Sequence, residues 1–283
     1  MTSFQRGLTD PVVKFLNDEY QASDSFWRSL IDDNRFFLAI RNNYLNAYRH
    51  GCSFVKIDPN LNSKELKCST ASKYLVKSGS VVSINGLIPC DSLEMYEDLR
   101  SENDRQGILR NMQKYAGPEA IGVTELLKKN INVVDVEVAI PGEKTRVDLV
   151  AAQKTDLGHE LVFYEAKTIF DSRVRASGEG IPEVIGQMEK YAHALKANEG
   201  LILDSYRTVI SNFRMLKGFT GDRLDFFENI DVDKLSLCLQ PKLIFVGYTA
   251  ASKKDWLESN ALHHEKLIGA LGKESVFIGR KTL

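Results

Sequence analysis

Two short apolar runs in the middle of the chain constrain its fold most strongly. They are "TRVDLV" at 145–150 and "ELVFYEAKT" at 160–168, and both have the length and composition of β-strands. Residues i and i+2 of a strand project from the same face, so Glu165 and Lys167 share a face. Asp148 can join them if the two strands pair. The sequence therefore predicts two carboxylates and an ammonium close together at one end of a sheet.

These side chains are the kinds that a magnesium site requires. Mg²⁺ binds hard oxygen ligands and keeps several waters, and Asp148 and Glu165 offer carboxylate oxygens while Ala166 offers its carbonyl. A metal-bound water loses a proton more easily than a free one. Lys167 could hold that water or stabilise charge on a phosphate. The pattern indicates phosphodiester hydrolysis. The alternative is an ordinary solvated strand face, since the chain has 38 acidic residues.

The flanking segments are predicted to be helical. A Gly-Pro pair starts a predicted helix at 117–130, and a strand with alternating valines follows at 131–140. A second helix is predicted at 181–196, where apolar residues recur with helical spacing. Gln187 and Tyr191 are four residues apart and so lie on one side of this helix. They could bind a phosphate or the water shell of a metal. The alternative is a surface glutamine above a half-buried tyrosine.

This order of motifs resembles the PD-(D/E)xK, or restriction-endonuclease-like, nuclease superfamily. It is most similar to the RecB-type and Mrr-like branch, which carries a Q-x-x-x-Y motif in the helix after the E-x-K strand. The matching residues are Asp148, Glu165 and Lys167 for D…E-x-K, and Gln187 and Tyr191 for Q-x-x-x-Y. The resemblance covers residues 117–249, about half of the chain.

The resemblance implies an α/β fold with a restriction-endonuclease-like core, in which helices flank a mixed sheet. In this family the first helix often brings a further carboxylate to the metals. Glu119 fits that role by its position, and Glu125 is the alternative. Val147 stands where the motif has proline, at a position that varies widely in the family. The implied metal ligands are Asp148, Glu165, the carbonyl of Ala166, and Glu119.

The implied activity is that of a Mg²⁺-dependent nuclease, with Mn²⁺ as a substitute and DNA preferred to RNA as substrate. The implied catalytic residues are Asp148, Glu165, Lys167, Glu119, Gln187 and Tyr191. Small nucleases of this kind often belong to prokaryotic restriction or antiphage defence systems, which would supply a partner protein. Two alternatives remain open: a catalytically idle module of the same fold that binds nucleic acid or protein, and a nuclease directed at RNA.

Three arginines are candidate phosphate contacts. Arg173 and Arg175 lie in a glycine-containing loop before the second helix, and Arg146 precedes Asp148 by two residues on the same strand face. With Gln187 and Tyr191 they form the predicted nucleic-acid-binding set. The alternative for the loop is a solvated segment whose arginines pair with nearby carboxylates. Because the net charge is −1, binding to nucleic acid has to come from such a local patch.

A chain of 283 residues can form two domains. Residues 1–115 are expected to form an α+β accessory module, and residues 116–283 the nuclease-like domain. The accessory module begins with two short helices and continues as a meander with tight turns at 42–43 and 50–51. Tyr44 and Tyr48 share one strand face. That face is expected to be packed, and base stacking is the alternative.

Further strands are expected within residues 73–86, and a charged helical stretch within 91–115. Near the C-terminus, residues 241–249 predict a core strand, residues 252–271 a helix with Ser252 as its N-cap, and residues 275–280 a last strand. The four cysteines are scattered without metal-ligand spacing. With neither an 18-residue apolar run nor a signal-peptide pattern, we expect a cytoplasmic protein with no membrane association. Base rates favour a symmetric homodimer.

Overall fold

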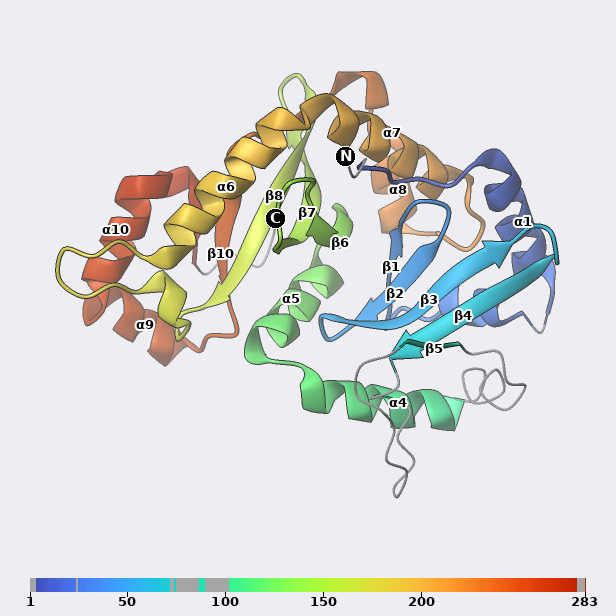
Figure 1. The fold of residues 1–283 in the computed structure, drawn as a ribbon, viewed down its shortest axis with the longest axis horizontal. Coiled ribbons are helices and arrows are strands. Elements are labelled where there is room, and N and C mark those ends of the chain that lie inside the picture. The colour runs from blue at the N-terminus through green and yellow to red at the C-terminus, as the bar shows by residue number, and fades with distance from the viewer. Residues whose placement is uncertain (1–3, 24, 72–73, 75–86, 90–101, 279–282) are drawn as a thin grey trace. The chain divides into compact units, whose positions relative to one another are not determined.

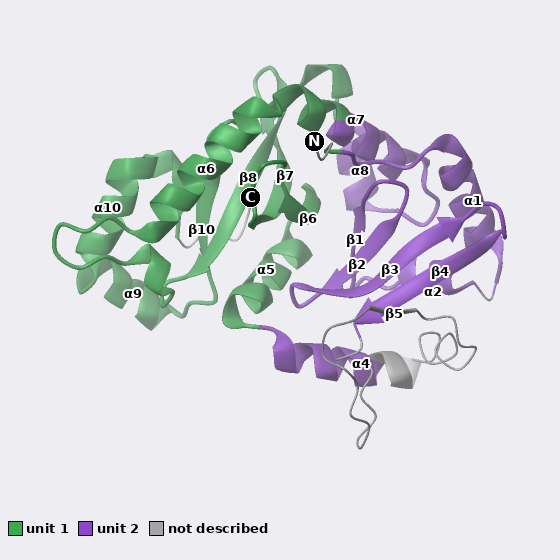
Figure 2. Ribbon diagram, in the orientation of Figure 1, with its two compact units in different colours: residues 1–4, 117–204, 230–283 green, residues 5–116, 205–229 purple. Residues whose placement is uncertain are grey.

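The computed structural model describes residues 4–23, 25–71, 74, 87–89, 102–278 and 283 of the chain (Figure 1). It divides the chain into two units (Figure 2). Unit 1 comprises residues 1–4, 117–204 and 230–283, and unit 2 comprises residues 5–116 and 205–229.

Unit 2 contains an antiparallel sheet with strand order β1-β2-β3-β4-β5. The strands are β1 (Phe37–Ile40), β2 (Leu45–Arg49), β3 (Cys52–Asn60), β4 (Glu65–Ala71) and β5 (Leu87–Pro89). Its helices are α1 (Asp10–Gln21), α2 (Phe26–Ile31), α4 (Glu102–Tyr115), α8 (Asp222–Glu228) and the second part of α7 (Glu199–Met215). The predicted α+β character of the N-terminal region is thus present.

The predicted meander is confirmed, because β1, β2 and β3 pair as consecutive antiparallel strands. Its turns contain Asn43, His50 and Gly51, all with positive φ, as tight hairpin turns require. Tyr48 is only 5% exposed, and its hydroxyl accepts hydrogen bonds from Arg41 and Asn46. Tyr48 is therefore packed, as expected, whereas Tyr44 precedes β2 and is partly exposed, with the ammonium of Lys56 4.4 Å from the centre of its ring.

The sequence prediction missed strand β4, whose residues alternate between exposed and buried along "ELKCSTA". Of the strands expected within 73–86, only position 74 lies among the described residues, and residues 91–101 of the helical stretch lie outside them. The rest of that stretch forms α4.

Unit 1 contains a mixed sheet with strand order β11-β10-β8-β7-β6, and β9 also pairs with β8. The strands are β6 (Val133–Ala139), β7 (Arg146–Thr155), β8 (Gly158–Thr168), β9 (Leu235–Leu237), β10 (Lys242–Val246) and β11 (Val276–Phe277). The first three pair antiparallel, and β9 and β10 pair parallel to β8. The helices are α5 (Pro118–Lys129), α6 (Glu183–Ala197), the first part of α7, α9 (Ala250–Glu258) and α10 (Ala261–Leu271). The predicted α/β class with a mixed sheet flanked by helices is therefore present (Figure 1).

Strand β8 is the centre of unit 1. Residues 161–167 of β8 are all buried, as expected for a strand with neighbours on both edges and helices over its faces. Helix α5 packs against β8 and β10. This contact is close at Gly122, where a Cβ atom would lie 2.5 Å from Cβ of Val246. A residue larger than glycine would push α5 away from the sheet.

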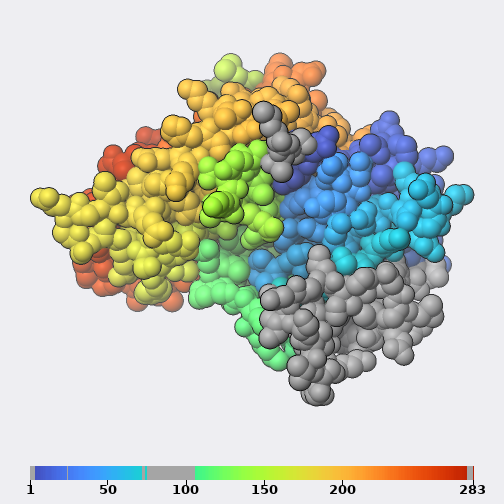
Figure 3. Space-filling model, in the orientation of Figure 1, coloured from blue at the N-terminus to red at the C-terminus, as the bar shows by residue number. Residues whose placement is uncertain are grey.

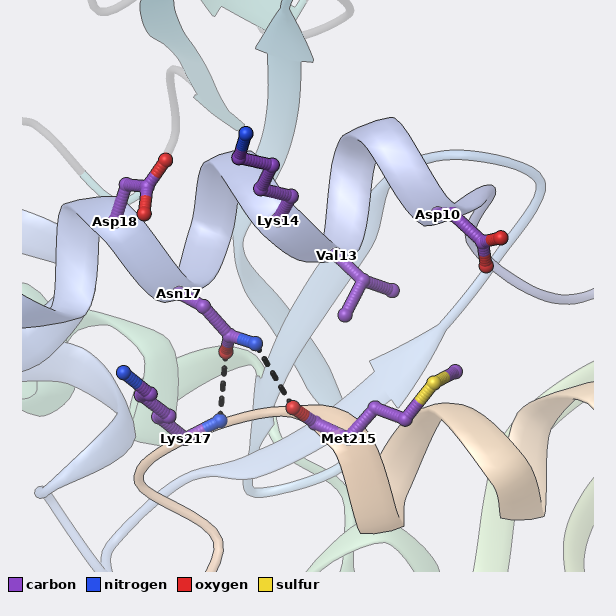
Figure 4. A pocket seen from close by; sticks show the side chains of 7 residues that line it. All are labelled: Asp10, Val13, Lys14, Asn17, Asp18, Met215 and Lys217. Atoms are coloured by element: carbon purple, nitrogen blue, oxygen red, sulfur yellow. Dashed lines mark hydrogen bonds between the residues drawn. The ribbon is translucent and has the colours of Figure 1, made fainter.

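The boundary between units falls at 116/117, next to the predicted boundary at 115/116. Residues 205–229, however, belong to unit 2 rather than to the C-terminal domain in which the sequence placed them. The Asn212 side chain accepts from the backbone N–H of Leu8 and donates to its carbonyl. Asn17 likewise accepts from Lys217 N and donates to Met215 O (Figure 4). Such contacts join residues about 200 positions apart and leave no local signal.

The predicted single helix at 252–271 is wrong, because the chain breaks into α9 and α10. The N-cap of α9 is Thr249, whose hydroxyl accepts from Ser252 N. Ser252 occupies the third helical position instead, where its hydroxyl accepts from Thr249 N and completes a capping box. Asn260 separates the two helices, and its side chain donates to the Asp255 carboxylate.

Candidate functional site

The pairing of β7 with β8 brings the central acidic residues together. In the antiparallel register Leu149 lies opposite Tyr164, so the next pair along the strands is Asp148 and Glu165. The backbone N–H of Ala166 donates to Oδ2 of Asp148 over 2.6 Å. This hydrogen bond fixes the carboxylate of Asp148 against the backbone of β8.

Glu165 and Lys167 form a buried ion pair. Their exposed fractions are 2% and 1%, and Lys167 Nζ lies 2.5 Å from Oε1 of Glu165. The ammonium also donates to the carbonyl of Ala166 over 2.8 Å, and Oε2 of Glu119 lies 3.5 Å from it. Three of the four predicted metal ligands therefore surround one cationic nitrogen.

The second oxygen of Glu165 is the exception in this network. Oε2 is buried and accepts no hydrogen bond from the residues that the structure describes. A buried acceptor without a donor costs free energy, so it is uncommon in folded proteins. An anionic oxygen in that position can coordinate a cation or accept a hydrogen bond from a ligand.

Helix α6 adds Gln187 and Tyr191 to the cluster, and the two side chains share one side of the helix, as their spacing predicted. Gln187 Nε2 donates to Oε1 of Glu165 over 2.7 Å and to the hydroxyl of Tyr191 over 2.8 Å. The hydroxyl of Tyr191, which is fully buried, lies 3.0 Å from both Thr145 Oγ1 and the carbonyl of Arg146. Gln187 therefore faces the carboxylates rather than bulk solvent, and β7 holds Tyr191 in place.

Burial dominates the electrostatics of the two carboxylates. Desolvation raises the pKa of Asp148 well above its ordinary value, and the charge of Glu165 raises it further. Desolvation also raises the pKa of Glu165, although Lys167 opposes this shift. Burial by itself lowers the pKa of Lys167, but the charges of Glu165 and Asp148 outweigh it, and the net shift is upward. The pKa of Tyr191 is raised to about 12, mainly by desolvation.

Of the two candidate helix carboxylates, Glu119 is the one that reaches this cluster. It lies in the first turn of α5, between Lys167 and Arg173, whose Nη2 is 3.9 Å from Oε2 of Glu119. Glu125 instead pairs with Lys128, three residues along the same helix, and both side chains are about half exposed.

The three predicted arginine contacts are placed differently from one another. Arg173 forms a two-point ion pair with Asp171 at the edge of the cluster, and hydrogen bonding to Arg173 lowers the pKa of Asp171 in spite of burial. Arg175 donates to the carbonyl of Ile169, and its guanidinium lies 5.5 Å from the centre of the Trp256 ring. Arg146 is largely exposed on β7, within 3.9 Å of Glu137.

Sequence reasoning did not identify Thr145 or Asp171 as parts of the site. Thr145 orients the hydroxyl of Tyr191, and Asp171 holds Arg173 beside Glu119. Neither residue belongs to a motif. Asp171 is one of the nearby carboxylates that can pair with an arginine of the loop, and in the structure it pairs with Arg173 at the border of the site.

Within the described part of the chain, no three His, Cys, Asp or Glu side chains are arranged as a ready metal site. The ammonium of Lys167 instead lies 3.5 Å from Oε2 of Glu119 and 2.5 Å from Oε1 of Glu165. The same residues include no helix with both the length and the apolar character needed to cross a membrane. A shallow surface hollow in unit 2, formed by α1 and residues 215–217, is lined by mixed polar and apolar side chains (Figure 4).

No protein-family model matches the chain, and no curated protein or solved structure is significantly similar to it. Any functional assignment therefore rests on the geometry of the cluster formed by Glu119, Asp148, Glu165, Lys167, Gln187 and Tyr191.

Proposed function

We propose that this chain is a divalent-metal-dependent nuclease, and that unit 1 is a restriction-endonuclease-like core. The observation that carries the proposal is the buried Glu165 carboxylate, which is paired with Lys167 through Oε1 and lacks a donor at Oε2. A purely structural ion pair is more stable when all of its polar atoms are satisfied. An unsatisfied acid at the meeting point of four motif residues is typical of a site that awaits a ligand.

The cluster suits a Mg²⁺ or Mn²⁺ ion by the chemistry of its donors. Asp148, Glu165, Glu119 and the carbonyl of Ala166 would hold the ion, since all are hard oxygen ligands. When bound, the ion would lower the pKa of a coordinated water and offset phosphate charge. Its entry requires Lys167 to yield the position between Glu119 and Glu165 that its ammonium occupies.

The remaining residues would act on the substrate through hydrogen bonds and charge. Lys167, released from Glu165, would donate to the phosphate oxygen on which negative charge develops. Gln187 would keep Glu165 oriented, or would donate to a phosphate oxygen when Glu165 turns to its ligand. Arg173 lies at the edge of this group and would position the phosphate.

A second candidate function is an idle module that binds nucleic acid or protein. The observation that favours it is the closed pairing of Lys167 with Glu165 and Glu119, which neutralises charge without a metal. A nuclease directed at RNA is the third candidate. A defence setting with a partner protein is part of the proposal through the family resemblance, and a cytoplasmic homodimer is part of it through the sequence expectations alone.

One experiment separates these candidates. The purified chain is incubated with plasmid DNA, single-stranded DNA and RNA in the presence of Mg²⁺, Mn²⁺ or EDTA. We expect metal-dependent cleavage of DNA that is absent in EDTA and in Glu165→Gln. Cleavage of RNA alone would favour the third candidate. Binding without cleavage of any substrate would favour the idle module.

A further inference from the structure

The segment that leaves the cluster, residues 169–182 between β8 and α6, is held by its own side chains. Asp171 accepts from the backbone N–H of Arg173 and pairs with its guanidinium. The guanidinium of Arg175 donates a hydrogen bond to the carbonyl of Ile169 and lies over the ring of Trp256 in α9. We call residues 169–182 the β8–α6 segment. These contacts fix its first half beside the carboxylates.

Helix α10 holds the second half of the β8–α6 segment. The backbone N–H of Ala176 donates to His263 Nδ1 over 3.3 Å. Lys266 Nζ donates to the carbonyls of Gly178 and Gly180, over 2.5 and 2.8 Å. Figure 1 shows this segment in yellow alongside α9 and α10. Its backbone is therefore positioned before any substrate binds.

Although it is held so firmly, the segment exposes two large apolar side chains. Phe170 is 66% exposed and Ile181 is 75% exposed, while Ile169 and Val174 of the same segment are buried. Phe170 follows Lys167 by three residues, so their Cα atoms are at most ~11 Å apart. That distance is about three stacked base steps of one DNA strand at ~3.4 Å each. Figure 3 shows the outer surface formed by the residues after β8, in yellow.

The charges of this segment do not favour a duplex. Affinity for double-stranded DNA depends mainly on cations that neutralise phosphates. Arg173, which would position one phosphate at the cluster, is also paired with Asp171. Arg175 is engaged by Ile169 and Trp256, and the chain as a whole has a net charge of −1. Stacking of an unpaired base on an exposed ring adds affinity that does not come from charge, and it tolerates any sequence.

We propose that Phe170 is a stacking subsite for an unpaired base next to the phosphate bound at the Glu165 cluster. The substrate class is then a single-stranded or locally opened strand rather than an intact duplex. This inference rests on the proposed nuclease function, which it makes more specific. Phe170 is a specificity-determining residue in this account, because its ring contacts the substrate away from the reacting atoms.

The test measures binding in EDTA, where cleavage is excluded. Fluorescence anisotropy gives the affinity of the chain for a single-stranded oligonucleotide and for its duplex. An oligonucleotide containing 2-aminopurine reports stacking through fluorescence quenching. We expect Phe170→Ala to weaken single-strand binding by about 10-fold, within the range for loss of one stacked base, and to abolish the quenching. Phe170→Trp should retain both, and duplex binding should change little.

The matched control is Leu157→Ala, which removes an 87% exposed apolar side chain at the far end of the β7–β8 hairpin. It should bind the single strand like the wild type. Phe170→Leu keeps an apolar side chain without a ring and should behave like Phe170→Ala. Thermal melting of each variant should match the wild type, because position 170 is exposed.

The inference would be overturned if Phe170→Ala and Leu157→Ala had equal single-strand affinity. Full affinity and quenching in Phe170→Leu would also overturn it. So would the absence of single-strand binding by the wild type. Cleavage assays with Mg²⁺ on the same oligonucleotides separate this failure from that of the proposed function. If the chain cleaves with metal but its binding does not depend on Phe170, only the stacking proposal is contradicted and the nuclease proposal stands. Phe170-dependent binding by a chain that cleaves nothing would retain the subsite and contradict the nuclease.

Discussion

The ammonium of Lys167 lies 2.5 Å from Oε1 of Glu165, and both side chains are almost completely buried. The two residues lie two positions apart on the same face of β8, which is why the ion pair forms within one strand. Glu119 and Asp148 add negative charge around the same nitrogen. One cation thus stabilises an acidic cluster that would otherwise repel itself.

Loss of Lys167 should therefore destabilise the protein as well as stop cleavage. Lys167→Ala leaves a cavity and buried carboxylates without their cation, and breaking a buried pair costs about 3–5 kcal/mol. Lys167→Met fills most of the volume and should cost less. Urea unfolding of both variants checks this, with the exposed Lys190→Ala of α6 as control. A loss below about 1 kcal/mol in Lys167→Ala would show that the ion pair contributes little.

As pH rises, the stability of Lys167→Met should decrease more steeply than that of the wild type. Burial raises the pKa of Glu165 and Asp148 above their ordinary values of 4.5 and 3.8. Between the ordinary and the raised pKa, the unfolded chain binds fewer protons than the folded one, so stability decreases as pH rises. Lys167 opposes this effect in the wild type by favouring the ionised carboxylates.

Unfolding free energies at pH 5 and pH 8 measure this difference. We expect Lys167→Met to lose more stability relative to the wild type at pH 8 than at pH 5. The double variant Glu165→Gln/Lys167→Met should show a smaller change with pH, because one of the two titrating acids is gone. A deficit that is the same at both pH values would contradict the coupling.

Several features of this site could be predicted from the sequence, because they depend on local periodicity. The two-residue spacing of Glu165 and Lys167 and the four-residue spacing of Gln187 and Tyr191 each determine a shared face, and hydrogen bonds join both pairs. The depth of burial was not predictable. It depends on the way α5 and α6 cover β8, which is a matter of long-range packing.

The same distinction applies to the fold. The meander turns at Asn43 and His50 follow from residues that tolerate positive φ. Residues 205–229 belong to unit 2 through long-range contacts, among them the hydrogen bonds of Asn212 and Asn17, whose partners are about 200 positions away. The apolar pattern continues across the break between α9 and α10. Asn260 is the sequence signal at this break, and it is a weak one.

Gln187→Ala should reduce turnover more than stability. The side chain is half-buried, and its amide orients Glu165 and Tyr191 without filling the core. We expect a fall in kcat of at least about 10-fold, because one positioned donor is lost, with a stability loss of about 1 kcal/mol or less. Steady-state kinetics and thermal melting are compared with those of Lys190→Ala on the same helix. Parallel loss of kcat and Tm would assign Gln187 to packing alone.

Metal affinity should rise when the competing ammonium is removed. Lys167 Nζ lies among the oxygens of Glu119, Glu165 and Ala166, so a divalent ion has to displace it. We expect Lys167→Met to bind Mn²⁺ about 10-fold more tightly than the wild type, a gain of about 1.4 kcal/mol. Isothermal titration calorimetry measures this without substrate. Glu165→Gln serves as the negative control, and unchanged affinity in Lys167→Met would place the ion elsewhere.

The most direct test of the central claim is cleavage of labelled single-stranded DNA by the wild type and by Glu165→Gln, with Mn²⁺ or EDTA. Circular dichroism first establishes that the variant is folded. The account predicts cleavage by the wild type with Mn²⁺, none in EDTA, and at least a 100-fold lower rate in Glu165→Gln, on the order of other losses of essential charge stabilisation. Cleavage by a folded Glu165→Gln at the wild-type rate would contradict it.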